Sequence, residues 1–161
     1  MPTLKELIQD AAVGLFVERP GAKKTVQEWT TKLEDNAKAI EARARSAKNQ
    51  QKAQIVLRHI SGIERWGQRR LRVFLGEPLL IDEYNNYQPA KDLNTEQQVA
   101  EFSKTRAQTI EIVRRIVDNP ANGSVDADEN KVLHNQFGPI SLRGWLRYLD
   151  LHANLESKKI R

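Results

Sequence analysis

Apolar residues recur along this chain at every third or fourth position, which is the spacing of one face of an α-helix. In the clearest segment they are Val26, Trp29, Leu33, Ala37, Ile40 and Ala44. Thr25 and Glu28 stand at its start in the arrangement of a capping box, in which a hydroxyl and a carboxylate satisfy free backbone N–H groups. The pattern predicts a helix over residues 25–46.

Two further helices are expected in the first half of the chain. One runs from a cap at Asn49 to Gly76, just ahead of Pro78. Its predicted inward line contains Ile55, His59, Ile63 and Trp66. A short leading helix, which Pro20 and Gly21 end, has an apolar face formed by Leu4, Leu7, Ile8, Ala11 and Leu15.

The second half of the chain contains two more helical segments. Thr95 and Gln98 form another capping box, and Ser141 is the expected N-cap of the last helix. That helix carries Leu142, Trp145, Tyr148, Leu149, His152, Leu155 and Glu156. Residues 77–94 form a long loop rich in Asp, Asn, Tyr and Pro, and loops of this length are often functional.

Together these segments predict an all-α fold made of a single domain over residues 1–161. Four long amphipathic helices, each with one apolar stripe, are most simply satisfied as a four-helix bundle. The prediction adds a short extra N-terminal helix and places the long loop between the second and third long helices.

Composition narrows the chemistry and the compartment. The chain has 161 residues and no cysteine, which excludes disulfides, Cys-ligated zinc, iron–sulfur clusters and a thiol nucleophile of its own. No apolar run approaches the roughly 20 residues that a bilayer requires, and no secretory signal is visible. We therefore expect a cytoplasmic protein that has no membrane partner.

Charge is distributed unevenly along the chain. Residues 41–72 hold 9 basic and 2 acidic side chains, a net charge of 9 − 2 = +7, whereas residues 73–131 hold 6 and 11, a net charge of 6 − 11 = −5. Charge-complementary packing explains this arrangement better than a nucleic-acid surface, because the basic segment lacks stacking aromatics other than Trp66. The nucleic-acid alternative loses its basis if Arg69, Arg70 and Arg72 pair with acidic side chains.

The candidate chemistry lies with two of the three histidines. His59 and His152 fall on apolar stripes, and Glu156 follows His152 by one helical turn, so the two side chains share a face. Two imidazoles and one carboxylate from facing helices form the kind of ligand set that leaves open positions on a divalent ion. The alternatives are a hydrogen-bonded core histidine at position 59 and a surface charge pair between His152 and Glu156.

Other polar residues have simpler interpretations. His134, in the turn-forming segment that precedes Ser141, is expected to cap a turn or to be exposed. Glu64 is expected in an interhelical pair, and Arg106 either contacts Glu64 or an anionic ligand, or extends to solvent along the apolar surface. Trp66, Trp145 and Tyr148 are expected in the core rather than around a substrate.

Three stretches in order resemble the DinB/YfiT-like family of metal-binding four-helix-bundle proteins, over nearly all of the chain from Trp29 onward. They are residues 56–66 (VLRHISGIERW), 134–141 (HNQFGPIS) and 146–156 (LRYLDLHANLE). The resemblance implies that His59 and His152 are metal ligands. The chain departs from the family at Glu156, which stands where a third histidine is usual. This residue either ligates as a carboxylate or marks a lost metal site.

The resemblance also implies a function. It predicts a metal-dependent enzyme that carries out thiol-dependent S-transfer or hydrolysis on a small molecule, with zinc, iron, nickel or manganese bound by His59, His152 and Glu156. No organic cofactor is expected. A low-molecular-weight thiol would arrive with the substrate, and a homodimer is the expected assembly. The alternative is a non-catalytic, stress-related binding module that keeps the bundle without metal chemistry.

Overall fold

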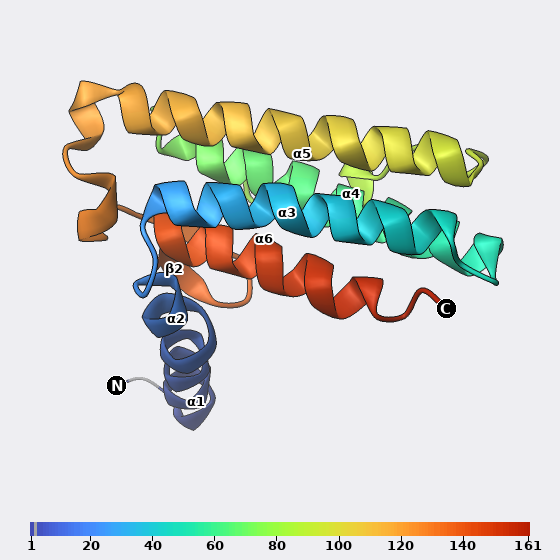
Figure 1. The fold of residues 1–161 in the computed structure, drawn as a ribbon. Helices are drawn as coiled ribbons and strands as arrows, with labels where there is room; N and C mark the ends of the chain where they lie inside the picture. Colours follow the sequence, from blue (N-terminus) through green and yellow to red (C-terminus); the bar gives the residue numbers. More distant parts are fainter. Residues whose placement is uncertain (2) are drawn as a thin grey trace.

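The computed structural model describes residue 1 and residues 3–161, and this part of the chain is mainly helical with one small antiparallel sheet (Figure 1). The long helices are α3 (Val26–Arg45), α4 (Gln50–Val73), α5 (Thr95–Asp118) and α6 (Leu142–Ser157). The leading segment consists of α1 (Leu4–Val13), the π-helical turn η1 (Gly14–Glu18) and α2 (Arg19–Gly21). The remaining elements are the 3₁₀ turns η2 (Tyr84–Tyr87), η3 (Pro120–Asn122) and η4 (Val125–Ala127) and the strands β1 (Lys131–His134) and β2 (Gly138–Ser141). The predicted all-α class is confirmed as a mainly helical chain, and the single domain stays a prediction.

The four long helices lie alongside one another (Figure 1). Helices α4 and α5 run in the same direction, because Gln54 bonds Thr95 and, farther along both helices, Glu64 bonds Arg106. Two parallel neighbours need a connection that returns over the whole length of the first helix. The long loop expected from the sequence fills this need.

Residues 74–94 form this return path along α4. The carboxylate of Glu77 pairs with Arg69, and the carbonyl of Asp82 accepts a hydrogen bond from the Trp66 indole at 3.0 Å. Farther back, Arg58 donates to the Pro89 carbonyl at 2.8 Å. The loop therefore covers the C-terminal two thirds of one face of α4.

Local signals set most of the helix starts. The capping box of Thr25 and Glu28 is present, and Ser141 accepts a hydrogen bond from the Gly144 backbone as the N-cap of α6. The capping box expected at Thr95 lies one residue earlier, because the amide side chain of Asn94 caps α5 and pairs with Gln97. Asparagine is as good an N-cap as threonine, so the capping box itself was predicted correctly and only its position was wrong by one residue.

The hairpin before α6 was not predicted. Strands β1 and β2 pair antiparallel, with Val132 opposite Ile140 and His134 opposite Gly138. Gly138 has a φ of 73°, a backbone conformation that favours glycine. Strands of four residues are too short to show a clear alternation of apolar and polar residues, which is why the sequence indicated only a turn here.

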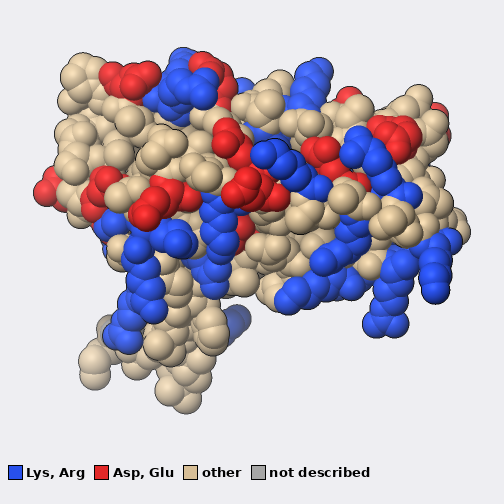
Figure 2. All heavy atoms as spheres, in the orientation of Figure 1, with Lys and Arg blue, Asp and Glu red and all other residues tan. Residues whose placement is uncertain are grey.

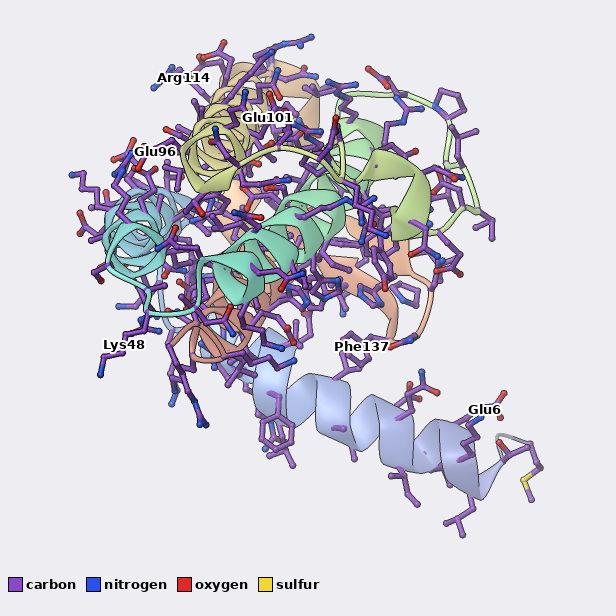
Figure 3. All side chains as sticks on the ribbon, turned by 90° about the vertical axis from the view of Figure 1, so that its right-hand side faces the viewer. Glu6, Lys48, Glu96, Glu101, Arg114 and Phe137 are labelled. Atoms are coloured by element: carbon purple, nitrogen blue, oxygen red, sulfur yellow. The ribbon has the colours of Figure 1, made fainter. Side chains whose placement is uncertain are left out.

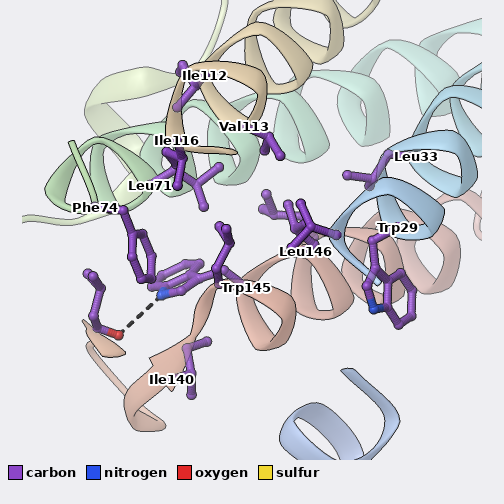
Figure 4. Close-up of a cluster of buried hydrophobic side chains, with 14 of the residues drawn as sticks. Trp29, Leu33, Leu71, Phe74, Ile112, Val113, Ile116, Ile140, Trp145 and Leu146 are labelled. Atoms are coloured by element: carbon purple, nitrogen blue, oxygen red, sulfur yellow. Dashed lines mark hydrogen bonds between the residues drawn. The ribbon is translucent and has the colours of Figure 1, made fainter. Parts of the chain in front are cut away.

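The largest apolar cluster lies between the long helices at the end that carries the hairpin (Figure 4). At its centre, Trp145 is fully buried and its indole N–H donates to the Val132 carbonyl at 3.2 Å, the bond drawn in Figure 4. The predicted inward line of α4 is wrong at one position. Ile55 is 58% exposed, whereas its neighbours Val56 and Leu57 are buried.

The leading helix projects from the body formed by the long helices, with Glu6 near its far end (Figure 3). Its apolar face is exposed rather than packed, as the exposed fractions of Leu4 (74%), Leu7 (52%) and Ile8 (62%) show. Burial begins at Val13, close to the body. The homodimer expected from the sequence stays a prediction.

Charge-complementary packing is present. Arg65 pairs with Glu101, Arg69 with Glu77, and Arg70 lies 3.7 Å from the Asp82 carboxylate. On the face shown in Figure 2, acidic and basic side chains are interspersed over α3 and α5, and Lys and Arg project along the lower edge. Within the described residues, none of the helices has the length and apolar character needed to cross a membrane.

Candidate metal centre

Two histidines from distant parts of the sequence meet between α4 and α6. The Nε2 atoms of His59 and His152 lie 3.2 Å apart, and their ring centroids are separated by 5.1 Å. Both side chains are half-buried. Helices α4 and α6 run in opposite directions. They also approach closely where Gly67 of α4 lies against Leu149 of α6.

The spacing of the two nitrogens has two chemical explanations. A proton on one Nε2 makes a hydrogen bond to the lone pair of the other. Alternatively, both lone pairs point at one cation. Two imidazole nitrogens on a tetrahedral zinc ion, each at about 2.0–2.1 Å, lie roughly 3.3 Å from each other, so the observed distance of 3.2 Å between His59 and His152 fits a shared ion.

Glu156 supplies the third donor. One ligand atom each from His59, His152 and Glu156 lies within 4.8 Å of the others. Both carboxylate oxygens of Glu156 accept hydrogen bonds from Lys159 at 2.8 Å. The three residues therefore fit a divalent ion once the carboxylate turns from Lys159 toward the imidazoles. The Lys159 side chain is 55% exposed, so it is free to release the carboxylate into solvent.

The surroundings keep both imidazoles neutral. Burial lowers the pKa of His59, with Glu156 opposing and Lys159 adding to the shift. Burial and the neighbouring His59 lower the pKa of His152 to about 4. Burial raises the pKa of the Glu156 carboxyl, but the hydrogen bond and charge of Lys159 outweigh it and the pKa is lowered. Neutral imidazoles and an ionised carboxylate are the protonation states that metal binding requires.

A cavity of about 210 Å³ opens beside His152. His152 lines it together with Trp66, Tyr84, His134 and Tyr148. The Tyr84 ring also meets the His59 ring edge-on, with centroids 5.2 Å apart. Sequence reasoning missed Tyr84, because only the folded path of the loop brings it to α4. It also assigned Trp66 and Tyr148 to the core alone, whereas both border the cavity.

The expectation of an exposed or turn-capping His134 is half right. Its Nδ1 accepts hydrogen bonds from the backbone N–H groups of Gln136 and Phe137, so it does cap the turn. The side chain is only 3% exposed, however, and packs among aromatic rings that include Trp66 and Tyr148. It is buried because the unpredicted hairpin folds the turn back over α4 and α6.

A buried ion pair links α4 and α5, and its Glu64 carboxylate opposes the lowering of the pKa of His152. Arg106 donates to both carboxylate oxygens of Glu64, at 2.7 and 2.8 Å, and both residues are 2% exposed. The interhelical pair expected for Glu64 is confirmed. Of the alternatives for Arg106, the contact with Glu64 is confirmed and the extension to solvent is wrong, because Glu64 and the Leu33 carbonyl satisfy the guanidinium in the core.

Comparison with models of known protein families, with curated proteins and with solved structures finds no match to this chain. The resemblance to DinB/YfiT-like proteins therefore stays a prediction from the sequence motifs.

Proposed function

We propose that the chain is a metal-dependent enzyme with a DinB-like four-helix bundle, acting on a small molecule at a His59, His152 and Glu156 centre. The observation that carries the proposal is the 3.2 Å separation of two imidazole nitrogens whose residues are 93 positions apart in sequence. A carboxylate within 4.8 Å and an adjacent cavity supply the other parts of such a site.

In this proposal His59 and His152 hold a divalent ion through Nε2, and Glu156 completes the set. Zinc, iron, nickel and manganese all accept nitrogen and carboxylate donors. Such an ion acts as a Lewis acid that polarises a carbonyl or eases deprotonation of a water or thiol. Because the chain has no cysteine, the thiol of an S-transfer reaction is part of the substrate. Hydrolysis is the other reaction class that this ligand set supports.

Metal analysis of the purified protein tests the proposal. We expect close to one equivalent of divalent metal, or saturable uptake of one equivalent of zinc by chelator-treated protein. His152→Ala is expected to abolish uptake. His134→Asn is the matched control, because it removes the only histidine of the chain outside the three proposed ligands and is expected to leave uptake intact. Uptake below about a tenth of an equivalent in the wild-type protein contradicts the proposal.

One observation favours a second candidate, a non-catalytic binding module. The contacts of the centre are satisfied without an ion, since His59 and His152 can share a proton and Lys159 neutralises Glu156. This candidate predicts a melting temperature that does not respond to zinc or to chelators. Melting temperatures of the purified protein with zinc and with chelator therefore distinguish the two candidate functions.

A further inference from the structure

One residue that lines the cavity, His134, has a buried ring nitrogen without a hydrogen-bond partner in the described part of the chain. The Nε2 atom of His134 has no hydrogen-bond partner among the described residues, although the side chain is only 3% exposed. His134 borders the cavity of about 210 Å³ that opens beside His152. A buried polar atom without a partner is costly, and native structures rarely keep one without a reason.

The turn determines what this nitrogen can do. Nδ1 accepts from the backbone N–H groups of Gln136 at 3.2 Å and Phe137 at 3.3 Å, so it must carry a lone pair rather than a proton. A neutral imidazole with an unprotonated Nδ1 has its proton on Nε2. Nε2 of His134 is therefore a hydrogen-bond donor, and the group that it lacks is an acceptor.

The hydroxyl of Tyr148, which also lines the cavity, is a second donor, and it is not fully buried. Among the described residues, no side chain or backbone atom hydrogen-bonds to the hydroxyl of Tyr148, whose ring lies 4.6 Å from that of His134. The nearby amide of Asn135 offers no compensation. Its nitrogen donates to Asp82 and Glu83, and its oxygen accepts from Arg70.

The rest of the wall is mixed, because apolar side chains lie beside Glu83, Gln136 and His152. The rings of Trp66, Tyr84 and Tyr148 border the cavity together with the Ile63 side chain. The cavity volume of about 210 Å³ exceeds the roughly 150 Å³ of an engineered protein cavity that binds benzene, so a small organic molecule fits. Aromatic walls with a few convergent polar groups are the usual make-up of a ligand site.

We propose that this cavity binds a small planar molecule through a carbonyl or carboxylate oxygen, which accepts the hydrogen bond of His134 Nε2 while the apolar part lies against Trp66 and Tyr148. The proposal goes beyond the metal centre, since it holds equally for metal-free protein. If the metal centre is real, His134 is the residue that orients the substrate beside it.

Two acceptor probes and one donor probe test the proposal on full-length, chelator-treated protein at pH 7.5. Benzoate and benzamide carry an oxygen acceptor on a planar ring, whereas benzylamine offers an ammonium donor. Long-range ¹H–¹⁵N correlation spectra of the imidazoles are expected to show a protonated Nε2 at His134. Both acceptor probes are expected to shift this resonance with saturable, millimolar binding, which is the range that ligands of this size reach. Benzylamine is expected to leave it unchanged.

His134→Asn is the decisive variant. The Asn side-chain oxygen can replace Nδ1 as the acceptor of the turn, but it places no donor at the position of Nε2. Circular dichroism and the melting temperature establish that the variant folds, and Tyr148→Phe serves as a second variant that removes only the hydroxyl. We expect at least five-fold weaker benzoate binding in His134→Asn and a smaller loss in Tyr148→Phe.

Equal binding of benzoate by the wild-type protein and by a folded His134→Asn overturns the proposal. A His134 protonated at Nδ1 overturns it as well, and so does the absence of saturable binding by either acceptor probe. Failure here is separable from failure of the metal centre, because zinc uptake and probe binding are measured independently. Probe binding without zinc uptake leaves the cavity proposal standing alone, and zinc uptake without probe binding rejects it.

Discussion

The imidazoles of His59 and His152 face each other Nε2 to Nε2 at 3.2 Å, each at the same level of two antiparallel helices. Each ring is half-buried and has a lowered pKa, so both are neutral near pH 7. Two neutral rings at this distance share either one proton or one cation, and the two states differ in their response to added metal.

Zinc is therefore expected to stabilise the folded chain. An ion that binds the native site and not the unfolded chain adds about 2.7 kcal/mol at a free concentration of 100 Kd. Thermal melts with buffered zinc and with chelator measure the shift. The double variant His59→Asn/His152→Asn is the control, because it keeps polar side chains at both positions and removes the two histidines of the three proposed ligands. An equal shift in the double variant assigns the zinc to another site.

The pair formed by Glu156 and Lys159 is expected to set the affinity of the centre. Lys159 holds both carboxylate oxygens at 2.8 Å and so competes with a metal ion for Glu156. We expect Lys159→Met to tighten zinc binding and Glu156→Gln to weaken it, each measured by competition with a chromogenic chelator. Glu156→His is expected to tighten binding as well, because it supplies a third imidazole and removes the anchor of Lys159. Unchanged affinity in all three variants shows that Glu156 is not a ligand.

The meeting of the two histidines was predictable because their helices have clear apolar faces. The line on α3 from Val26 to Ala44 is buried as predicted, and His152 lies on the inward side of α6. Spacing alone indicated that His152 and Glu156 share one face. What the sequence does not contain is which helices are neighbours, and the resemblance to a known family supplied that expectation.

The line on α4 shows why the rest could not be predicted. It changes from exposed at Ile55 through half-buried at His59 to buried at Trp66. The cover over its C-terminal half comes from the loop, through Tyr84 and Asp82, and from the hairpin at His134. A periodic pattern identifies an apolar face, but it does not reveal the path of a loop that covers only part of that face. Because the cavity is formed by that loop path, the sequence did not predict the cavity either.

The buried pair of Glu64 and Arg106 is expected to be stabilising only as a pair. Each partner is 2% exposed, and Thr109 donates a further hydrogen bond to Glu64 at 2.7 Å. Removing one partner leaves an uncompensated buried charge, so Arg106→Met should lower the free energy of unfolding by about 3–5 kcal/mol. The double variant Glu64→Gln/Arg106→Met should lose less than the sum of the two single changes. Additive losses in chemical denaturation argue against direct coupling.

The exposed apolar face of α1 gives a prediction about assembly. Leu4, Leu7 and Ile8 are more than half exposed, so removal of residues 1–12 is expected to change the free energy of unfolding of a monomer by less than about 1 kcal/mol. Light scattering and thermal melts of the truncated chain measure mass and stability. A halved mass together with a lower melting temperature would instead identify this face as the interface of the homodimer expected from the sequence.

The buried imidazole of His134 is expected to make the fold sensitive to acid. Burial, the charge of Arg70 and the neighbouring His152 lower its pKa to about 4, against an ordinary value of 6.5. Above pH 6.5 the ring is neutral in both folded and unfolded chains. Between pH 6.5 and 4 the unfolded chain binds the proton and the folded chain does not, so stability falls with falling pH by about 3 kcal/mol and then levels off.

His134→Asn isolates this contribution. The variant keeps the acceptor that caps the turn and removes the titrating group, while His152 and the carboxylates titrate as before. We expect the loss of unfolding free energy between pH 6.5 and 4 to be smaller by about 3 kcal/mol in the variant than in the wild-type protein, in urea denaturation with chelator present. Because both chains share every other acid-sensitive group, the difference between the two profiles belongs to His134. Parallel profiles would mean that the ring gains a proton as easily in the fold as in the unfolded chain, which burial of the side chain at 3% exposure opposes.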